Sequence, residues 1–114
     1  MDSLCITDIE LWTRLGVPEE ERKTEQHILV TIELLGDLSP VGKSDDVTRG
    51  IDYEKLTNDV RSLAKTERKT IECLAEDIAA MVLKSYKPQS VKVSVWKEPL
   101  PGVRGVKATI QRPS

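Results

Sequence analysis

Four side chains that can exchange or hold protons fall at the ends of the structural elements expected from the sequence. They are Glu21, Tyr53, Glu72 and Lys97. A lysine or a tyrosine can act as a general acid or base, and a carboxylate can accept protons or bind the N–H groups of a ligand. Groups at the ends of rigid elements are well held and still reach the surface, where binding and catalysis take place. The set is therefore a candidate acid/base site, provided that the fold brings its members together.

Lys97 stands at the end of an expected strand. Val91, Val93 and Val95 alternate with polar or amphipathic residues, which is the period of a half-buried strand. The strand runs into the segment 98–102, Glu-Pro-Leu-Pro-Gly, where each proline fixes its own φ and disfavours helix in the residue before it. We expect a stiff turn that holds the lysine in place. On this stretch alone we favour a solvated lysine that protects a sheet edge, and an acid/base group is the functional alternative.

The other three candidates each have a plain structural alternative. Glu21 ends a run of three glutamates and could be a solvated charge. Tyr53 follows Asp52, an expected helix cap, and could be a core aromatic with a hydrated hydroxyl. Glu72 falls in the first turn of a second expected helix and could simply complement the helix dipole. Taken singly, none of them requires a catalytic role.

Length and composition limit the classes of function. The 114 residues suffice for a single domain, residues 1–114, and the 39% hydrophobic and 32% charged content is typical of a soluble protein. A net charge of −2 without a basic block argues against nucleic acid as a partner. No apolar run approaches the ~20 residues of a membrane span, and the first residues lack the features of a signal peptide. We expect a cytoplasmic protein that does not bind a membrane.

The cysteines and the histidine do not form a metal site. Cys5 and Cys73 lie far apart and fit no ligand spacing, so free thiols are expected in a reducing compartment. His27 is the only histidine, whereas a catalytic zinc site uses several imidazole or thiolate ligands. The sequence therefore predicts chemistry without a metal.

Hydrophobic periodicity predicts the order strand, strand, helix, helix, strand, strand. The first strand covers Leu4 to Leu11, and its apolar parity flips across Thr7 and Asp8, which predicts a β-bulge there. A charged connection with a helical turn follows at 18–22. The remaining elements are expected at 28–34, 53–64, 71–85, 91–97 and 106–111. The segment from Gly36 to Gly50 carries turn-type residues and is expected to be irregular.

This order predicts an α+β fold, a four-stranded antiparallel sheet with two helices on one face. The second face and both edges of so small a sheet stay uncovered. Unpaired edges need covering or pairing, and self-association is the simplest remedy. We therefore expect a homo-oligomer.

Short motifs along nearly the whole chain occur together at the spacing of one known family. They are Ile9–Leu11 with Leu15–Val17, Glu21 and Gln26, Ser44–Val47, Ile51–Tyr53, Ile71–Ala75, Lys97 with Pro101–Gly102, and Gly105–Val106. None of these motifs is specific alone. In combination the chain resembles the dihydroneopterin aldolases of folate biosynthesis.

The resemblance implies a tunnelling fold in which four subunits form a ring and two rings stack into an octamer, with active sites between neighbouring subunits. The implied reaction is the retro-aldol cleavage of 7,8-dihydroneopterin, a small pterin, to 6-hydroxymethyl-7,8-dihydropterin and glycolaldehyde. It implies no metal and no cofactor, because the pterin ring itself accepts the electron pair of the broken carbon–carbon bond.

The resemblance also implies a role for each matching residue. Lys97 would be the acid/base group, and Glu21 would bind the hydroxylated side chain of the substrate or its water. Tyr53, from the neighbouring subunit, would help to protonate the intermediate.

Four further residues would bind the substrate. Glu72 would accept hydrogen bonds from the N2 amino group and N3–H of the pterin, and Ile71 would line the pocket beside it. Ile51 and Asp52 would line the pocket from across the interface.

The chain departs from the family pattern at three places. Arg14–Gly16 stands where many members have tyrosine, histidine and glycine. The segment 97–102 is about one residue shorter than usual, and Trp96 replaces a small polar residue. These differences remove no implied catalytic group, but they could alter the substrate.

Two alternatives remain open. One is a sister activity on the same fold, epimerisation of dihydroneopterin or its triphosphate at C2′. A triphosphate would need a cationic site, for which Arg14, Arg22 and Arg104 are available. The other is a pterin-binding ring protein that has lost turnover.

Overall fold

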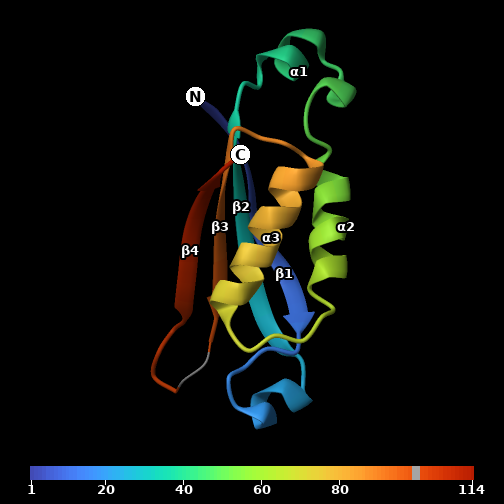
Figure 1. Cartoon of the computed structure of the whole chain (residues 1–114). Coiled ribbons are helices and arrows are strands. Elements are labelled where there is room, and N and C mark those ends of the chain that lie inside the picture. Colours follow the sequence, from blue (N-terminus) through green and yellow to red (C-terminus); the bar gives the residue numbers. More distant parts are fainter. Residues whose placement is uncertain (99–100) are drawn as a thin grey trace.

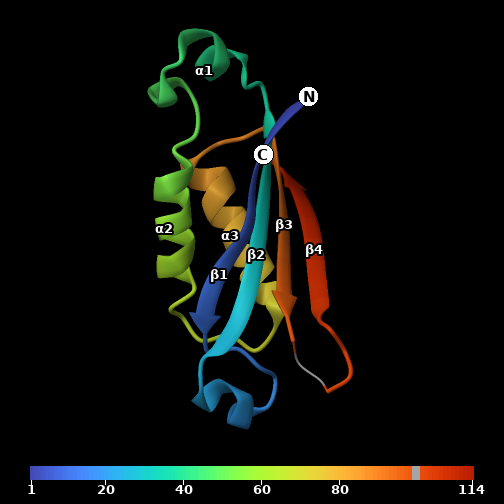
Figure 2. The same ribbon diagram turned by 180° about the vertical axis from the view of Figure 1, so that it is seen from behind.

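A four-stranded antiparallel sheet carries two helices on one face in the computed structural model, which describes residues 1–98 and 101–114 (Figure 1). The strands lie in the order β1-β2-β3-β4, and the reverse view shows the face without helices (Figure 2). The elements are β1 Asp2–Thr13, a 3-10 helix η1 Glu19–Lys23, β2 Gln26–Gly36, α1 Ser39–Ser44, a 3-10 helix η2 Val47–Arg49, α2 Tyr53–Leu63, α3 Ile71–Ser85, β3 Ser90–Lys97 and β4 Val106–Pro113. The predicted α+β class and element order are confirmed.

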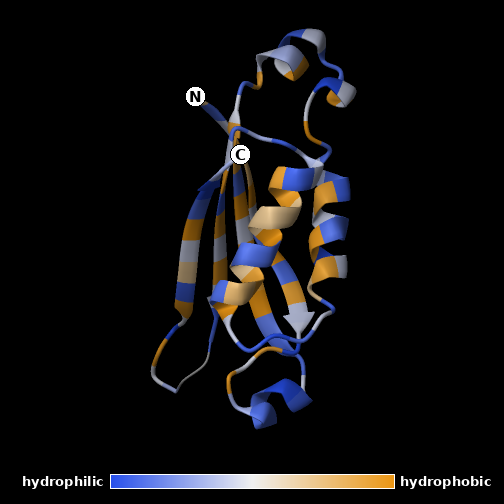
Figure 3. Cartoon of the chain, in the orientation of Figure 1, coloured by the Kyte–Doolittle hydropathy of each residue, from blue (hydrophilic) through white to orange (hydrophobic). Residues whose placement is uncertain are grey.

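The core lies between the sheet and the two long helices. Inward residues of β2 and β3 alternate with outward ones, and the inward residues Val30, Ile32, Val93 and Val95 are fully buried. Apolar bands recur along α2 and α3 and alternate with polar ones along the strands (Figure 3). Each of the two amphipathic helices therefore buries its stripe against the same sheet face. Within the described residues, no helix is long and apolar enough to cross a membrane.

The predicted β-bulge in β1 is present. The register of β1 on β2 shifts between Ile6 and Ile9, and Asp8 has a φ of 55°. The backbone N–H of Asp8 donates to the hydroxyl of Thr31 at 3.0 Å, which satisfies a group that the ladder leaves unpaired. Because of the bulge, the buried Ile9 and Leu11 face the core, as does the half-buried Ile6 before it.

Side-chain caps fix where both long helices begin. The carboxylate of Asp52 accepts the N–H of Lys55 at 3.2 Å, so α2 starts at Tyr53. The hydroxyl of Thr70 accepts the N–H of Cys73 at 3.1 Å, so Glu72 lies in the first turn of α3. Both predicted caps are confirmed.

The expectation that residues 36–50 are irregular is wrong. The segment contains α1 and η2. Pro40 sits in the first turn of α1, where its missing N–H costs nothing, and Asp45 ends the helix in the left-handed conformation with a φ of 58°. The side chain of Asp46 then caps η2. The residues that suggest turns in the sequence here lie at the ends of two short helices.

The open face of the sheet carries one aromatic cluster. The ring of His27 lies 4.9 Å from that of Trp12 and 6.4 Å from that of Trp96, centroid to centroid. A Cβ atom on Gly105 would overlap the indole of Trp96. Trp96 therefore packs against the start of β4 on the open face. The expected stiff turn beyond it includes Pro99 and Leu100, which lie outside the described residues.

A parallel bridge ties the segment after β1 to the connection between α2 and α3. The N–H of Arg68 donates to the carbonyl of Arg14 at 3.1 Å, and the N–H of Gly16 donates to the carbonyl of Arg68 at 3.2 Å. The Arg68 guanidinium, 7% exposed, pairs with Asp77 at 2.8 Å. It also donates to the carbonyl of Leu63, the last residue of α2, at 3.1 Å and to that of Thr66 in the following connection at 2.8 Å. A buried arginine thus joins the segment after β1, the end of α2 and helix α3.

Replacing Arg68 with methionine keeps much of the side-chain volume and removes the charge. The variant leaves two carbonyls and the Asp77 carboxylate without this donor, and we expect a loss of about 3 kcal/mol in the free energy of unfolding. Urea unfolding followed by circular dichroism measures it. The matched variant Arg61→Met, at an exposed position of α2, should change the value by less than about 0.5 kcal/mol. Equal effects of the two substitutions would contradict a structural role of Arg68.

Candidate active site

Lys97 is buried at the end of β3. It shares the parity of Val93 and Val95, so its side chain lies on the helix-covered face, and the residue is 8% exposed. Its ammonium donates to the carboxylate of Glu21 at 2.6 Å and to the carbonyl of Leu15 at 3.3 Å. The interpretation favoured from this strand alone, a solvated edge lysine, is therefore wrong. The sequence signal for burial is that Lys97 follows Val93 and Val95 at the same two-residue spacing, on the same face of the strand.

Glu21 reaches the lysine from η1, at the bottom of Figure 1. The charged connection does contain the expected helical turn, and the Glu21 side chain is 38% exposed. It packs against Gly16, where an added Cβ would lie 2.8 Å from Oε2 of Glu21. Only glycine at position 16 leaves room for the carboxylate in this position.

Glu72 opens into the same cavity as the ion pair. The cavity has a volume of about 380 Å³ and contains Glu21, Glu72 and Lys97. Its apolar wall comes from Leu15, Val17, Ile71, Val106 and Ala108, and its remaining polar lining from Lys69, Thr70 and Lys107. A planar, polar ligand could lie on the apolar wall while the carboxylate of Glu72 accepts its N–H groups.

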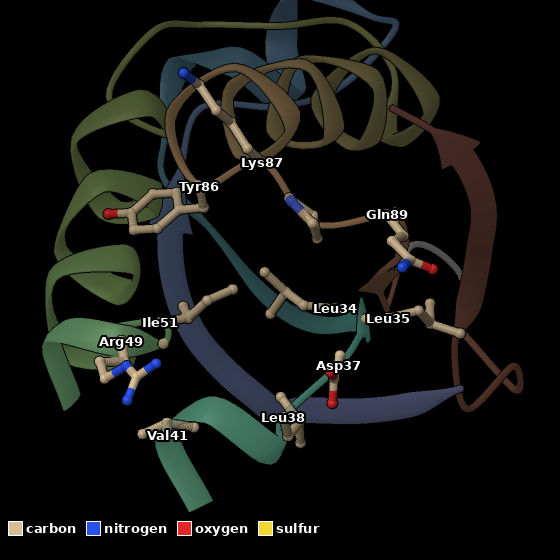
Figure 4. A pocket seen from close by; sticks show the side chains of 13 residues that line it. Leu34, Leu35, Asp37, Leu38, Val41, Arg49, Ile51, Tyr86, Lys87 and Gln89 are labelled. Carbon is tan, nitrogen blue, oxygen red and sulfur yellow. The ribbon is translucent and has the colours of Figure 1, made fainter. Parts of the chain in front are cut away.

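Three predicted site residues lie at the other end of the molecule. The helices α2 and α3 run antiparallel, so the start of α2 is far from the start of α3 (Figure 1). Tyr53 is 60% exposed there, next to the exposed Asp52. Ile51 lines a separate cavity of about 260 Å³ (Figure 4). A single chain therefore brings together Glu21, Glu72 and Lys97 with Ile71, and leaves Tyr53 apart.

The tyrosine that lines the separate cavity, Tyr86, is not a free acid/base group. The hydroxyl of Tyr86 donates to Asp59 at 2.5 Å. Burial, together with that carboxylate, raises the pKa of Tyr86 well above its usual range, so the phenol stays protonated. Of these two cavities, the one that contains Lys97 is therefore the better candidate for an acid/base site.

Two arginines that the triphosphate alternative needs are already engaged. Arg14 donates to the carbonyls of Arg22 and Lys23. Arg22 donates to the carbonyls of Gly16 and Val17 and pairs with Glu67. Both arginines therefore use part of their guanidinium donors within the chain.

Sequence reasoning missed Leu15, Lys69 and Lys107 as parts of the site. Leu15 contributes its backbone carbonyl, for which no side-chain signal exists. Lys69 and Lys107 are cations at the rim of the cavity. Strand alternation alone places Lys107 on the opposite parity from Ala108, and only the three-dimensional arrangement shows that both border the cavity.

Known proteins match this chain along most of its length. The family model described as dihydroneopterin aldolase (FolB) matches residues 4–111. The dihydroneopterin aldolase of Bacillus subtilis is 34% identical over 106 residues, which cover 90% of this chain and 88% of the relative. That of Staphylococcus epidermidis is 34% identical over 105 residues, covering 89% and 87%.

A solved structure agrees with these sequence matches. The Escherichia coli dihydroneopterin aldolase in complex with neopterin superposes with a TM-score of 0.93 at 27% identity, over 98% of this chain and 99% of that one. The fold agrees with the tunnelling fold expected from the resemblance. With a family model that spans residues 4–111 and relatives above 30% identity, this chain belongs to the dihydroneopterin aldolase family.

Proposed function

We propose that this protein cleaves 7,8-dihydroneopterin by a retro-aldol reaction, giving 6-hydroxymethyl-7,8-dihydropterin and glycolaldehyde. The observation that carries the proposal is the shared cavity of Lys97, Glu21 and Glu72, with a 2.6 Å ion pair between the first two. A scaffold has no need for a buried lysine beside two carboxylates. Membership of the dihydroneopterin aldolase family supports the same reaction.

Glu72 is proposed to bind the pterin ring. Its carboxylate can accept two N–H donors side by side, from the N2 amino group and N3–H. It lies in the first turn of α3, where the helix N-terminus carries partial positive charge. Ile71, buried beside it, supplies apolar wall. The relative from E. coli was solved with neopterin, a molecule of this class.

Lys97 and Glu21 are proposed to handle the proton of the substrate's C2′ hydroxyl. Loss of that proton, directly or through water, lets the C1′–C2′ bond break and releases glycolaldehyde. The electron pair stays on C1′ and is delocalised into the C6–N5 double bond of the ring, so no Schiff base is needed. A proton delivered to C1′ completes 6-hydroxymethyl-7,8-dihydropterin. The ion pair keeps both groups fixed beside the reacting bond.

Tyr53, Asp52 and Ile51 are proposed to enter the site from a neighbouring subunit, where Tyr53 helps to protonate C1′. They lie at the opposite end of their own subunit from Lys97. The strands β1 and β4 are the two edges of the sheet, and pairing them between copies would close a ring. We therefore propose a homo-oligomer, a ring of four or two stacked rings, in which each site uses two subunits.

Lys97→Ala should lower kcat for 7,8-dihydroneopterin by at least about a hundredfold, the usual contribution of an acid/base group. Chromatographic separation of the products measures it. Lys92→Ala, on the same strand with its exposed side chain on the other face, is the matched control and should keep full activity. Formation of only a C2′ epimer by the wild type would favour the epimerase. Pterin binding without any product would favour a protein that retains recognition alone.

Mixing two inactive variants tests whether the site is shared. In a ring assembled from equal amounts of Lys97→Ala and Tyr53→Phe subunits, about one site in four combines an unaltered lysine with an unaltered tyrosine. Co-refolded mixtures should therefore recover about a quarter of the wild-type activity, expected from random closed assembly. The same variants mixed without refolding are the control. Absence of recovery in assembled rings would show that Tyr53 does not act across an interface.

A further inference from the structure

We propose that Arg14 and Arg22 form a reciprocal brace that positions Glu21 against Lys97. This inference rests on the proposed aldolase function and adds two positioning residues to it. Neither arginine reaches into the cavity. Both act on the two backbone segments that hold the acceptors of the lysine.

Arg22 fastens the segment after β1. Its Nη1 donates to the carbonyls of Gly16 and Val17, both at 2.9 Å, and its Nε pairs with Glu67 at 3.2 Å. The side chain is 16% exposed. A planar guanidinium can serve several acceptors at once, which a lysine ammonium on a flexible stem does poorly. Arg22 therefore joins η1, the turn at Gly16 and the connection before α3.

Arg14 makes the reverse connection. Its Nη1 donates to the carbonyl of Arg22 at 3.0 Å and to that of Lys23. Each arginine thus holds the backbone of the segment that carries the other. The side chain of Gln26 adds a bond to the carbonyl of Glu21 at 3.0 Å. Three side chains therefore bind the carbonyls of η1 and of the turn facing it.

The brace matters because η1 has no apolar anchor in the core. None of its residues is buried, and no side chain caps its start. A short helix without apolar contacts depends on polar ones for its place. The two acceptors of Lys97, the Leu15 carbonyl and the Glu21 carboxylate, belong to the two segments that the arginines join. Movement of either segment would separate the lysine from an acceptor.

The brace also gives a role to the residues at Arg14–Gly16, where many family members have tyrosine, histidine and glycine. In this chain the first position carries one half of the brace, and Gly16 supplies both a carbonyl to Arg22 and the space for Glu21. In the proposed brace the two guanidinium groups position Glu21.

Steady-state kinetics of Arg22→Lys, Arg22→Ala and Arg14→Ala test the brace. A displaced acid/base pair slows the chemical step, so we expect kcat to fall about tenfold or more while KM changes less than about twofold. Glu67→Gln removes only a partly exposed ion pair and should keep most of the activity. A raised KM with unchanged kcat in the arginine variants would overturn the proposal.

A double-mutant cycle separates positioning from general stability. If Arg22 acts through Glu21, Arg22→Ala should cost little further kcat in a Glu21→Ala background, although it costs about tenfold alone. If the losses of kcat from the two substitutions multiply, the arginine acts independently of Glu21, and the proposal is overturned. Circular dichroism and urea unfolding identify any variant that fails to fold, and Arg22→Lys then replaces it in the cycle.

Chemical labelling of Lys97 gives a readout that needs no turnover. Mass spectrometry after brief acetylation should show slow labelling of Lys97 in the wild type and several-fold faster labelling in Arg22→Lys and Arg14→Ala. The exposed Lys92 in the same sample is the internal standard. Unchanged labelling of Lys97 would overturn the brace even in an active enzyme. Faster labelling in a protein without aldolase turnover would support the brace and refute the proposed reaction.

Discussion

An ammonium group removed from water must find acceptors, and the structure is arranged around meeting this need at Lys97. The residue is 8% exposed, and its acceptors come from residues 76 and 82 positions earlier in the chain. The antiparallel pairing of β2 with β3 brings the connection between β1 and β2 to the end of β3, where the lysine lies. Burying such a charge is tolerated only with a partner of good geometry. The order of the strands therefore also determines the geometry of the site.

Features set by neighbouring residues were predictable from the sequence. The parity flip at Thr7 and Asp8 predicted the bulge, and Asp52 and Thr70 predicted the helix starts. Alternation and helical periodicity predicted the strands, the helices and their order. Each of these signals acts within a few residues, because caps, bulges and periodicity are properties of the local backbone.

Features set by distant partners were not predictable in the same way. Arg14 and Arg22 are ordinary charged residues in the sequence, and only the folded chain shows that their guanidinium groups bind backbone carbonyls. The segment 36–50 is a local exception to this division: two short helices replace the expected irregular loop, since proline and aspartate occur at the ends of short helices as well as in turns. The separation of Tyr53 from Lys97 follows from the antiparallel helices, and only the resemblance had placed these two residues on different subunits.

The aromatic cluster on the open sheet face has a spectroscopic consequence. The chain contains two tryptophans, Trp12 and Trp96, and both rings neighbour His27. Tryptophan emission therefore originates from one patch of the sheet, on the side opposite the helices. Its wavelength and intensity will register a change in hydration or contacts of that patch. The interface between the sheet and the helices α2 and α3 contains no tryptophan. Tryptophan emission therefore does not report directly on the packing of these helices.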